Sequence, residues 1–322
     1  MTGLFGRKAV TALGIDIGST SVRLVELSRH GAGHRLEAWA MEPLADGAVV
    51  RRQIRDPALV GTALARAMAR VRIRAASAVV AVCGAAVVTR TLEMEAGLGD
   101  EEMHLQLRLE ANRHIPYPLE DVAIDFEVRE RTAHDPGRVS VFLAACRREH
   151  VQSREAALAL AGLRARAVDI EPCAIERVYR LLSCRLPPGD AVALLEVDTD
   201  MLRLDVLHDG YVCYSREQYF DERLPSDGPR DPAVFMVAES LRALQFFQAS
   251  GPPQAIGRIW LAGPAATVPG VAPLLQRRSA MATGVVDPFL GMSPDGRSGG
   301  RVPAEIAPAL LLACGLALGG LR

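Results

Sequence analysis

The chain has almost no lysine: Lys8 is the only one among 322 residues, although arginine is abundant. A phosphate-binding loop of the Gly-x-x-x-x-Gly-Lys-Ser/Thr type needs a hydroxyl residue after its lysine, and Lys8 is followed by Ala9. Schiff-base chemistry is disfavoured as well, because Lys8 lies near the terminus, where chains are weakly ordered. The sequence therefore argues against a P-loop NTPase and against a lysine-dependent enzyme.

Paired cysteines are also missing. The six cysteines form no Cys-x-x-Cys motif and most lie in apolar runs, so we expect buried free thiols in a reducing compartment. The seven histidines show no spacing typical of a metal-binding helix, and the N-terminus lacks the apolar core of a signal peptide. The net charge of −1 gives no global attraction toward nucleic acid. We expect a globular cytoplasmic protein that binds no nucleic acid.

The most informative stretch is residues 14–27, GIDIGSTSVRLVEL. It predicts a buried strand, a tight polar turn and a second strand. The turn region holds a carboxylate suited to a metal ion, a glycine that lets the backbone approach an anion, and two hydroxyls: Asp16, Gly18, Ser19 and Thr20. The alternative is an ordinary β-turn in which Ser and Thr satisfy their own backbone.

A degraded copy of this pattern recurs 180 residues later without a gap. Asp16 aligns with Glu196, Ser19 with Thr199 and Arg23 with Arg203. Two related α/β halves with paired hairpin turns would place a nucleotide cleft between them. Chance similarity between two apolar hairpins is the alternative.

Patterns along the chain predict two cores and an insertion. The first core comprises residues 1–83 and 162–189, an inserted α+β subdomain spans 84–161, and the second core spans 190–322, with a small helical portion near 221–253. Asp56-Pro57 predicts the start of a helix, and residues 187–189 (PPG) predict the boundary between the cores. The apolar run 306–321 is short for a membrane span and predicts a buried closing helix.

These features resemble the actin-like ATPase superfamily and, within it, the PilM family of type IV pilus assembly proteins, which is related to the division protein FtsA. Matching stretches follow one another in order at residues 13–27, 89–94, 110–120, 167–172, 244–247, 259–263, 268–271 and 287–289. Residues 115–119 (IPYPL) are the part most specific to PilM. The resemblance implies an α/β, actin-like (ribonuclease H-like) two-domain fold and a role in fimbrium biogenesis and twitching motility.

The resemblance also assigns roles in the cleft. It implies that Asp16 holds Mg²⁺, usually through water, and that Gly18, Ser19 and Thr20 contact the phosphates of ATP. Gly263 and Pro264 match the segment that packs on adenosine, and a plain strand-to-helix turn is an equally good interpretation.

Glu171 lies in the interdomain connection, where actin-like ATPases place a water-activating residue, so it is the catalytic candidate. An acid in the first turn of a helix is an equally good interpretation of Glu171.

The second hairpin departs from the family pattern Asp-Ile-Gly. Glu196 and Thr199 occupy nucleotide-facing positions, but Asp198 replaces the glycine and Asp200 follows. Two like charges about 4 Å apart cost about 4 kcal/mol at an effective dielectric near 20. Either the loop lies away from the phosphates, a cation bridges the two, or nucleotide binding is weak or lost. We therefore expect ATP and Mg²⁺ binding with little hydrolysis, at most a weak ATPase.

A partner also follows from the resemblance. PilM proteins bind the short N-terminal tail of the membrane protein PilN in a groove between the first core and the inserted subdomain. The segment from Arg108 to Asp125 is the expected groove wall, with internal packing as the alternative for any single residue. Attachment to the inner face of the bacterial inner membrane would then be peripheral, through the partner, and self-association is left open.

Two other functions are left open. An active phosphotransferase of the sugar-kinase and actin superfamily would need a catalytic aspartate opposite the γ-phosphate. A filament-forming protein like FtsA would need a C-terminal amphipathic membrane helix, and the C-terminal run carries no basic stripe.

Overall fold

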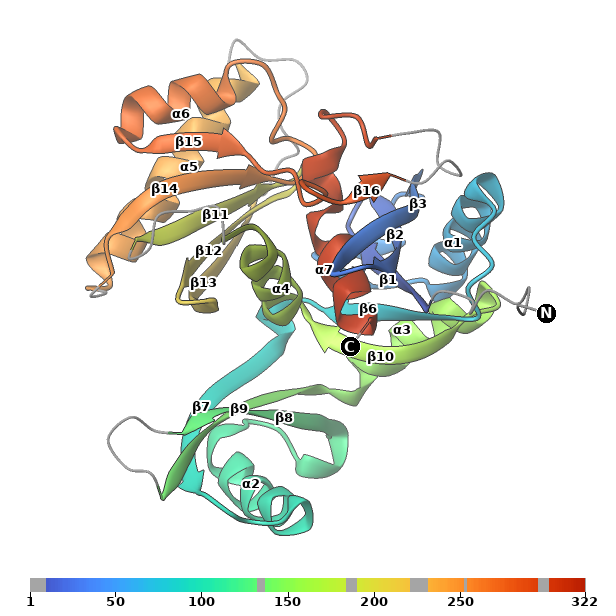
Figure 1. Ribbon diagram of the computed structural model, residues 1–322, viewed down its shortest axis with the longest axis vertical. Coiled ribbons are helices and arrows are strands. Elements are labelled where there is room, and N and C mark those ends of the chain that lie inside the picture. Colours follow the sequence, from blue (N-terminus) through green and yellow to red (C-terminus); the bar gives the residue numbers. More distant parts are fainter. Residues whose placement is uncertain are drawn as a thin grey trace, which may run out of the picture.

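The computed structural model describes residues 10–131, 137–183, 190–220, 231–251, 254–294 and 301–321. Two lobes, each built on its own sheet, lie side by side, and a smaller sheet-and-helix unit projects from the first lobe (Figure 1). This is the mixed α/β architecture with an inserted subdomain that the sequence predicts. The predicted boundary at 187–189 and residues 221–230 of the predicted helical portion lie outside the described residues.

The first core contains a six-stranded sheet in the order β10-β6-β1-β2-β3-β16. Its strands are β1 (Thr11–Ile17), β2 (Ser21–His30), β3 (Gly33–Pro43), β6 (Ser77–Val82), β10 (Arg164–Ile170) and β16 (Ser293–Pro294). The predicted hairpin is confirmed: β1 and β2 pair antiparallel, with Asp16 opposite Arg23. A short hairpin of β4 (Val49–Val50) and β5 (Gln53–Ile54) follows β3.

Helices α1 (Pro57–Val71) and α3 (Arg148–Leu160) belong to this core. The predicted start of α1 is confirmed, since Asp56 Oδ1 accepts the backbone N–H of Ala58 at 2.8 Å. A side chain at Gly61 would lie 2.6 Å from the Cβ of Leu160, so the two helices meet closely there. The sequence placed α3 inside the subdomain 84–161; its packing instead divides the chain near residue 147.

The second core contains a five-stranded sheet in the order β13-β12-β11-β14-β15. Its strands are β11 (Ala191–Val197), β12 (Met201–His208), β13 (Tyr211–Tyr219), β14 (Ile256–Ala262) and β15 (Ala282–Val285). Helices α5 (Pro232–Ala249) and α6 (Val271–Ser279) pack together on this sheet (Figure 1). Glu196 lies opposite Arg203 in the second hairpin, just as Asp16 lies opposite Arg23 in the first.

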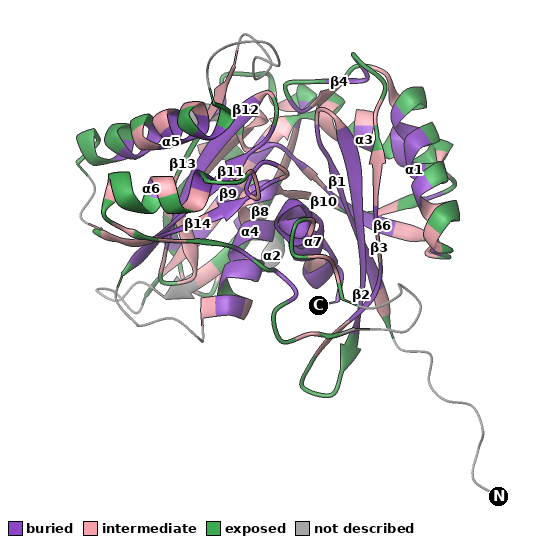
Figure 2. Ribbon diagram, turned by 90° about the horizontal axis from the view of Figure 1, so that it is seen from above, coloured by how far each residue is buried: buried purple, intermediate pink, exposed green. Residues whose placement is uncertain are grey.

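Two helices fill the space between the sheets: α4 (Glu171–Ser183), and α7 (Leu311–Gly320), which follows the 3₁₀ turn η4 (Ala307–Leu310). The predicted closing helix is confirmed, and almost all of α7 is buried (Figure 2). A Cβ at Gly14 would lie 2.1 Å from the Ala313 carbonyl oxygen, so only glycine admits α7 against β1. No helix in the described ranges is long and apolar enough to cross a membrane.

The inserted subdomain has a three-stranded sheet in the order β7-β9-β8. It comprises η1 (Gly84–Ala86), β7 (Val87–Glu95), α2 (Asp100–His114), η2 (Leu119–Asp121), β8 (Val122–Arg131) and β9 (Arg138–Arg147). Met103 and Leu107 of α2 pack against Val141 and Leu143 of β9. This small core covers one face of the sheet, and the other face is turned toward the first core.

Candidate functional site

The two hairpin turns meet at the interface between the cores, and an arginine connects them. Arg23 Nη1 donates to Asp16 Oδ2, and Arg23 Nη2 donates to Asp198 Oδ2, each at 2.9 Å. All three side chains are at most 2% exposed. A bridging cation was one of the ways in which the sequence could accommodate Asp198. That cation is the guanidinium of Arg23.

The second hairpin repeats this arrangement. Arg203 forms ion pairs with Glu196, its cross-strand neighbour, and with Glu171 at the start of α4. Its Nε also lies 2.9 Å from Asp205 Oδ2. The repeat thus preserves a cross-strand acid–arginine pair in each half, and the aligned Arg23 and Arg203 were its visible signal in the sequence.

A third arginine, Arg52, comes from the turn between β4 and β5. Its Nη2 lies 2.8 Å from both Asp16 Oδ1 and Glu171 Oε1, and its Nη1 lies 3.5 Å from Glu196 Oε1. Arg52 therefore connects three acids that the sequence analysis had singled out for nucleotide or metal chemistry. Nothing in the sequence around Arg52 indicated this role.

The cluster holds its charges in a buried environment. Burial alone would lower the pKa of Arg23, but Asp198 and Asp16 outweigh it and the pKa is raised. Burial raises the pKa of Asp198, but Arg23 reverses this and holds that pKa below its usual value. Burial raises the pKa of Asp205 to about 6, against the attraction of Arg203. Three guanidiniums thus face five carboxylates, so the cluster carries no surplus positive charge for a polyphosphate.

The phosphate-contact candidates lie beside this cluster. Gly18 donates its N–H to the Ser21 carbonyl at 3.0 Å, and the Thr20 carbonyl accepts from Leu44 at 2.9 Å. Ser19 Oγ is buried and has no hydrogen-bond partner among the described residues. In the second turn, Thr199 donates its N–H to Asp198 Oδ1 at 2.7 Å. Of the described phosphate-contact candidates, Ser19 thus has a buried polar atom that a ligand would satisfy.

The residues at Asp16 do not fit a magnesium ion. Both carboxylate oxygens accept from arginines, and a Cβ at Gly18 would lie 3.2 Å from Arg23 Nη1, so a guanidinium fills the space beside the glycine. Mg²⁺ requires oxygen ligands around it and excludes adjacent cations. Within the described ranges, no group of three or more His, Cys, Asp or Glu residues has a metal-binding arrangement.

Gly263 has a structural role in this molecule. Its φ of +85° lies in the left-handed region, and a Cβ would meet the Val197 carbonyl oxygen at 2.5 Å. Gly263 donates its N–H to Pro308 at 3.0 Å, and Ala265, which follows the half-buried Pro264, donates to Val197 at 3.1 Å. This turn after β14 therefore holds the end of β11 in place. The predicted packing of Gly263 and Pro264 on adenosine is untested.

Glu171 is the first residue of α4, 3% exposed and bonded to Arg52 and Arg203. The interpretation of Glu171 as an acid in a first helical turn fits this position. Both of its oxygens accept from arginines, which leaves neither free to activate a water molecule. Its predicted catalytic role is untested.

A groove separates the first core from the inserted subdomain. Two adjoining cavities of about 240 Å³ and 90 Å³ share lining residues Asp125, Ala144, Val168, Asp169 and Ile170. The smaller cavity has a mostly aliphatic lining. The larger one combines Phe126 and Phe142 with four charged side chains, those of Asp125, Glu127, Asp169 and Arg177. Of the predicted wall from Arg108 to Asp125, residues 123–125 line these cavities, whereas Arg108 lies on the exposed face of α2.

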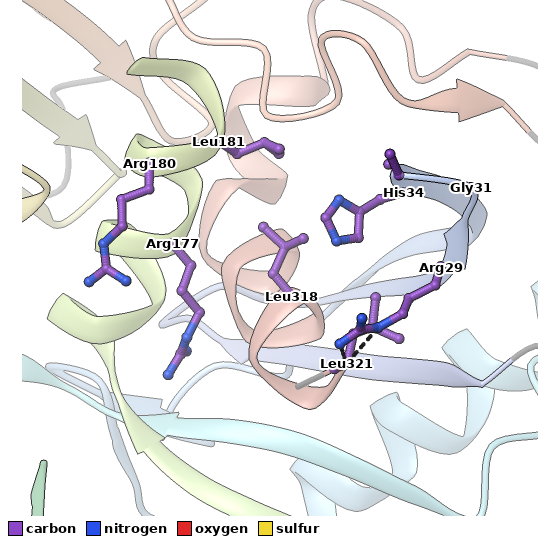
Figure 3. A pocket seen from close by; sticks show the side chains of 10 residues that line it. Arg29, Gly31, His34, Arg177, Arg180, Leu181, Leu318 and Leu321 are labelled. Atoms are coloured by element: carbon purple, nitrogen blue, oxygen red, sulfur yellow. Dashed lines mark hydrogen bonds between the residues drawn. The ribbon is translucent and has the colours of Figure 1, made fainter. Parts of the chain in front are cut away.

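A larger cavity of about 500 Å³ lies between the β2–β3 turn, α4 and the end of α7 (Figure 3). Arg29 donates to the Leu321 carbonyl at 3.0 Å, Arg180 donates to the Gly210 carbonyl at 3.0 Å, and Arg177 pairs with Asp169. Each guanidinium thus already has a hydrogen-bond or ion-pair partner within the protein. Arg177 and Arg180 also point away from His34 (Figure 3). The cavity has no convergent set of charges.

Comparison with known proteins places the chain in one family. The sequence profile described as "Type IV pilus assembly protein PilM" matches residues 14–224 and 232–321. A solved structure, the "PilM-PilN type IV pilus biogenesis complex", is similar over 98% of this chain and 100% of that chain, with 26% identity and a TM-score of 0.79. The ethanolamine utilization protein EutJ from Carboxydothermus hydrogenoformans matches over 97% and 90%, with 12% identity and a TM-score of 0.56. The predicted actin-like, two-domain α/β fold is confirmed.

Proposed function

The chain belongs to the PilM family of type IV pilus assembly proteins, and from that premise we propose that it is an assembly scaffold that binds the N-terminal tail of a PilN-like inner-membrane protein. The similar solved structure is a complex of PilM with PilN. The tail occupies the groove between the first core and the inserted subdomain. Through this partner the protein attaches peripherally to the cytoplasmic face of the inner membrane.

The observation that carries the proposal is the pair of sheet edges at the groove. β10 is at one edge of the six-stranded sheet and β8 is at one edge of the three-stranded sheet, among the described strands. Residues of both strands line the same two cavities. An extended peptide gains main-chain hydrogen bonds from a sheet edge and specificity from pockets for alternate side chains. The groove offers both.

The lining defines the chemistry of the tail. Ile124, Ala144, Val168 and Ile170 give aliphatic pockets suited to apolar side chains. The exposed carboxylates of Asp125 and Glu127 border the larger cavity. A tail with alternating apolar residues and a nearby positive charge matches this surface.

Catalysis is not required by this function. Binding of ATP and Mg²⁺ with little hydrolysis, expected from the sequence, is untested, and the two arginine contacts of Asp16 argue against it. The scaffold role depends on the groove, which is separate from the arginine cluster. An active phosphotransferase is disfavoured by the same contacts, and no described feature favours a filament-forming protein over a scaffold.

Titration of the full chain with a synthetic peptide of the PilN N-terminal tail tests the proposal. We expect saturable one-to-one binding and protection of β8 and β10 amides from hydrogen exchange. A scrambled peptide of the same composition is the control and should protect neither strand. Binding that leaves both strands unprotected, or no binding at all, would contradict the groove assignment.

A further inference from the structure

Arg51 and Arg52 form a turn of unusual sequence, here called the arginine turn. Val50 pairs with Gln53, so the two arginines are the whole loop between β4 and β5. Their φ values are +49° and +58°, a region that two-residue hairpin loops normally reach with Asn or Gly. Each non-glycine residue in this region costs about 1–2 kcal/mol. Contacts elsewhere must therefore hold the turn in place.

Those contacts come from both cores. The Arg51 guanidinium lies 5.6 Å from the centre of the Tyr219 ring. The Tyr219 hydroxyl donates to Glu217 Oε2 at 2.9 Å, and its oxygen lies 3.3 Å from the Arg51 carbonyl. On the other side, Arg154 Nη2 from α3 donates to the Arg52 carbonyl at 3.3 Å. The arginine turn is thus fixed between β13 of the second core and α3 of the first.

The fixed turn directs Arg52 between carboxylates from three elements: Asp16 of β1, Glu171 of α4 and Glu196 of β11. We propose that Arg52 is a built-in cation, which takes the position of a divalent metal ion among these acids and ties the two cores together without a nucleotide. Arg23 and Arg203 complete the bridge on either side. This inference concerns the cleft and does not depend on the peptide groove.

The proposal has a consequence for a chain that lacks the guanidinium. Replacing Arg52 removes a cation that Asp16, Glu171 and Glu196 share, and it leaves only one arginine on each of these acids. Three carboxylates around one space favour a hard divalent cation. Removal of Arg52 should therefore create a metal site that the natural chain does not have.

Mn²⁺ binding, followed by its electron paramagnetic resonance signal, tests this directly. We expect the full chain with Arg52→Met to bind Mn²⁺ at least about tenfold more tightly than the wild-type chain, and to lose this gain when Asp16→Asn is added. Arg52→Lys retains a cation, and Arg51→Met leaves Arg52 in place, so neither should gain Mn²⁺ binding.

Two outcomes would overturn the proposal. One is a folded Arg52→Met chain with the same weak Mn²⁺ binding as wild type. The other needs no variant: stoichiometric Mn²⁺ binding by the wild-type chain that Asp16→Asn abolishes. If Arg52→Met does not fold, the Mn²⁺ titrations of Arg52→Lys and of the wild-type chain test the proposal instead. Mn²⁺ binding by either chain would refute a built-in cation.

Discussion

The guanidinium of Arg23 on β2 lies 2.9 Å from the carboxylate of Asp198 in the turn of the second hairpin, 175 positions away in the sequence. The same guanidinium is bonded to Asp16 of the first hairpin. One side chain thus joins the two turns that would face a nucleotide from opposite sides. At this point the two cores are held together by salt bridges between side chains of the protein itself.

The Arg23 bridge should contribute strongly to stability. Arg23→Met leaves Asp198 buried without its guanidinium partner, and removal of one partner of a buried pair costs about 3–5 kcal/mol. Urea unfolding followed by circular dichroism measures the loss. Arg66→Met is the control, because Arg66 pairs with Glu42 but is more than half exposed, and it should cost less than about 1 kcal/mol.

Coupling between Arg23 and Asp198 is measured by adding Asp198→Asn to each background. We expect the double variant to be at least about 1 kcal/mol more stable than the sum of the single changes predicts. Additive effects would mean that the two residues do not form an energetic bridge.

Gly263 should not tolerate a side chain. In Gly263→Ala the Cβ would lie 2.5 Å from the Val197 carbonyl oxygen at a φ of +85°. We expect a loss of at least about 2 kcal/mol in the free energy of unfolding. Gly284→Ala is matched, since a Cβ there meets no atom within 4 Å and Gly284 has no positive φ. Equal stability of the two variants would show that the turn after β14 adapts.

Asp205 should make stability depend on pH. Burial raises its pKa from 3.8 to about 6, so the folded state binds a proton that the unfolded state does not bind between these values. Its contribution is greatest below pH 3.8 and is lost as pH rises through 6. Asp205→Asn removes the titration.

We therefore expect wild type to gain about 1.4 kcal/mol of stability relative to Asp205→Asn as pH falls from 8 to 5. Urea midpoints at the two pH values give this difference, and the other titrating groups cancel in the comparison. A constant difference between the two chains would place the pKa of Asp205 near its ordinary value.

Filling the groove should block the peptide. Ala144 lines both cavities between β8 and β10, so Ala144→Trp occupies the space meant for an apolar side chain. We expect at least about a tenfold weaker affinity for the PilN-tail peptide by calorimetry, equal to about 1.4 kcal/mol. Ala249→Trp, at the exposed end of α5, should bind like wild type. Unchanged affinity in Ala144→Trp would mean that the peptide binds at another site.

Local sequence signals were sufficient for the elements themselves. Two apolar segments around a polar turn predicted each hairpin. The Asp56-Pro57 pair predicted the start of α1, and the apolar C-terminal run predicted α7. The 180-residue repeat also aligned Arg23 with Arg203, which the structure places in matching cross-strand pairs. These features depend on neighbours close in the chain.

The chemistry of the cleft was less accessible, because it depends on tertiary contacts. Asp16, Glu171 and Glu196 were each identified as cleft candidates, but the side chain that joins them, Arg52, comes from a short hairpin without a motif. The packing partner of α3 was not identified for a similar reason: its buried Ala157 and Leu158 share a core with residues of α1. A pattern shows that a face is buried and does not identify its partner.

The most direct test of the bridged cleft is calorimetric titration of the wild-type chain with Mg·ATP, with thermal unfolding measured on the same samples. With arginines on both oxygens of Asp16, we expect no saturable heat and no rise in Tm at millimolar Mg·ATP. One-to-one binding with a rise in Tm would contradict this expectation, because the nucleotide would then have displaced the arginines from Asp16.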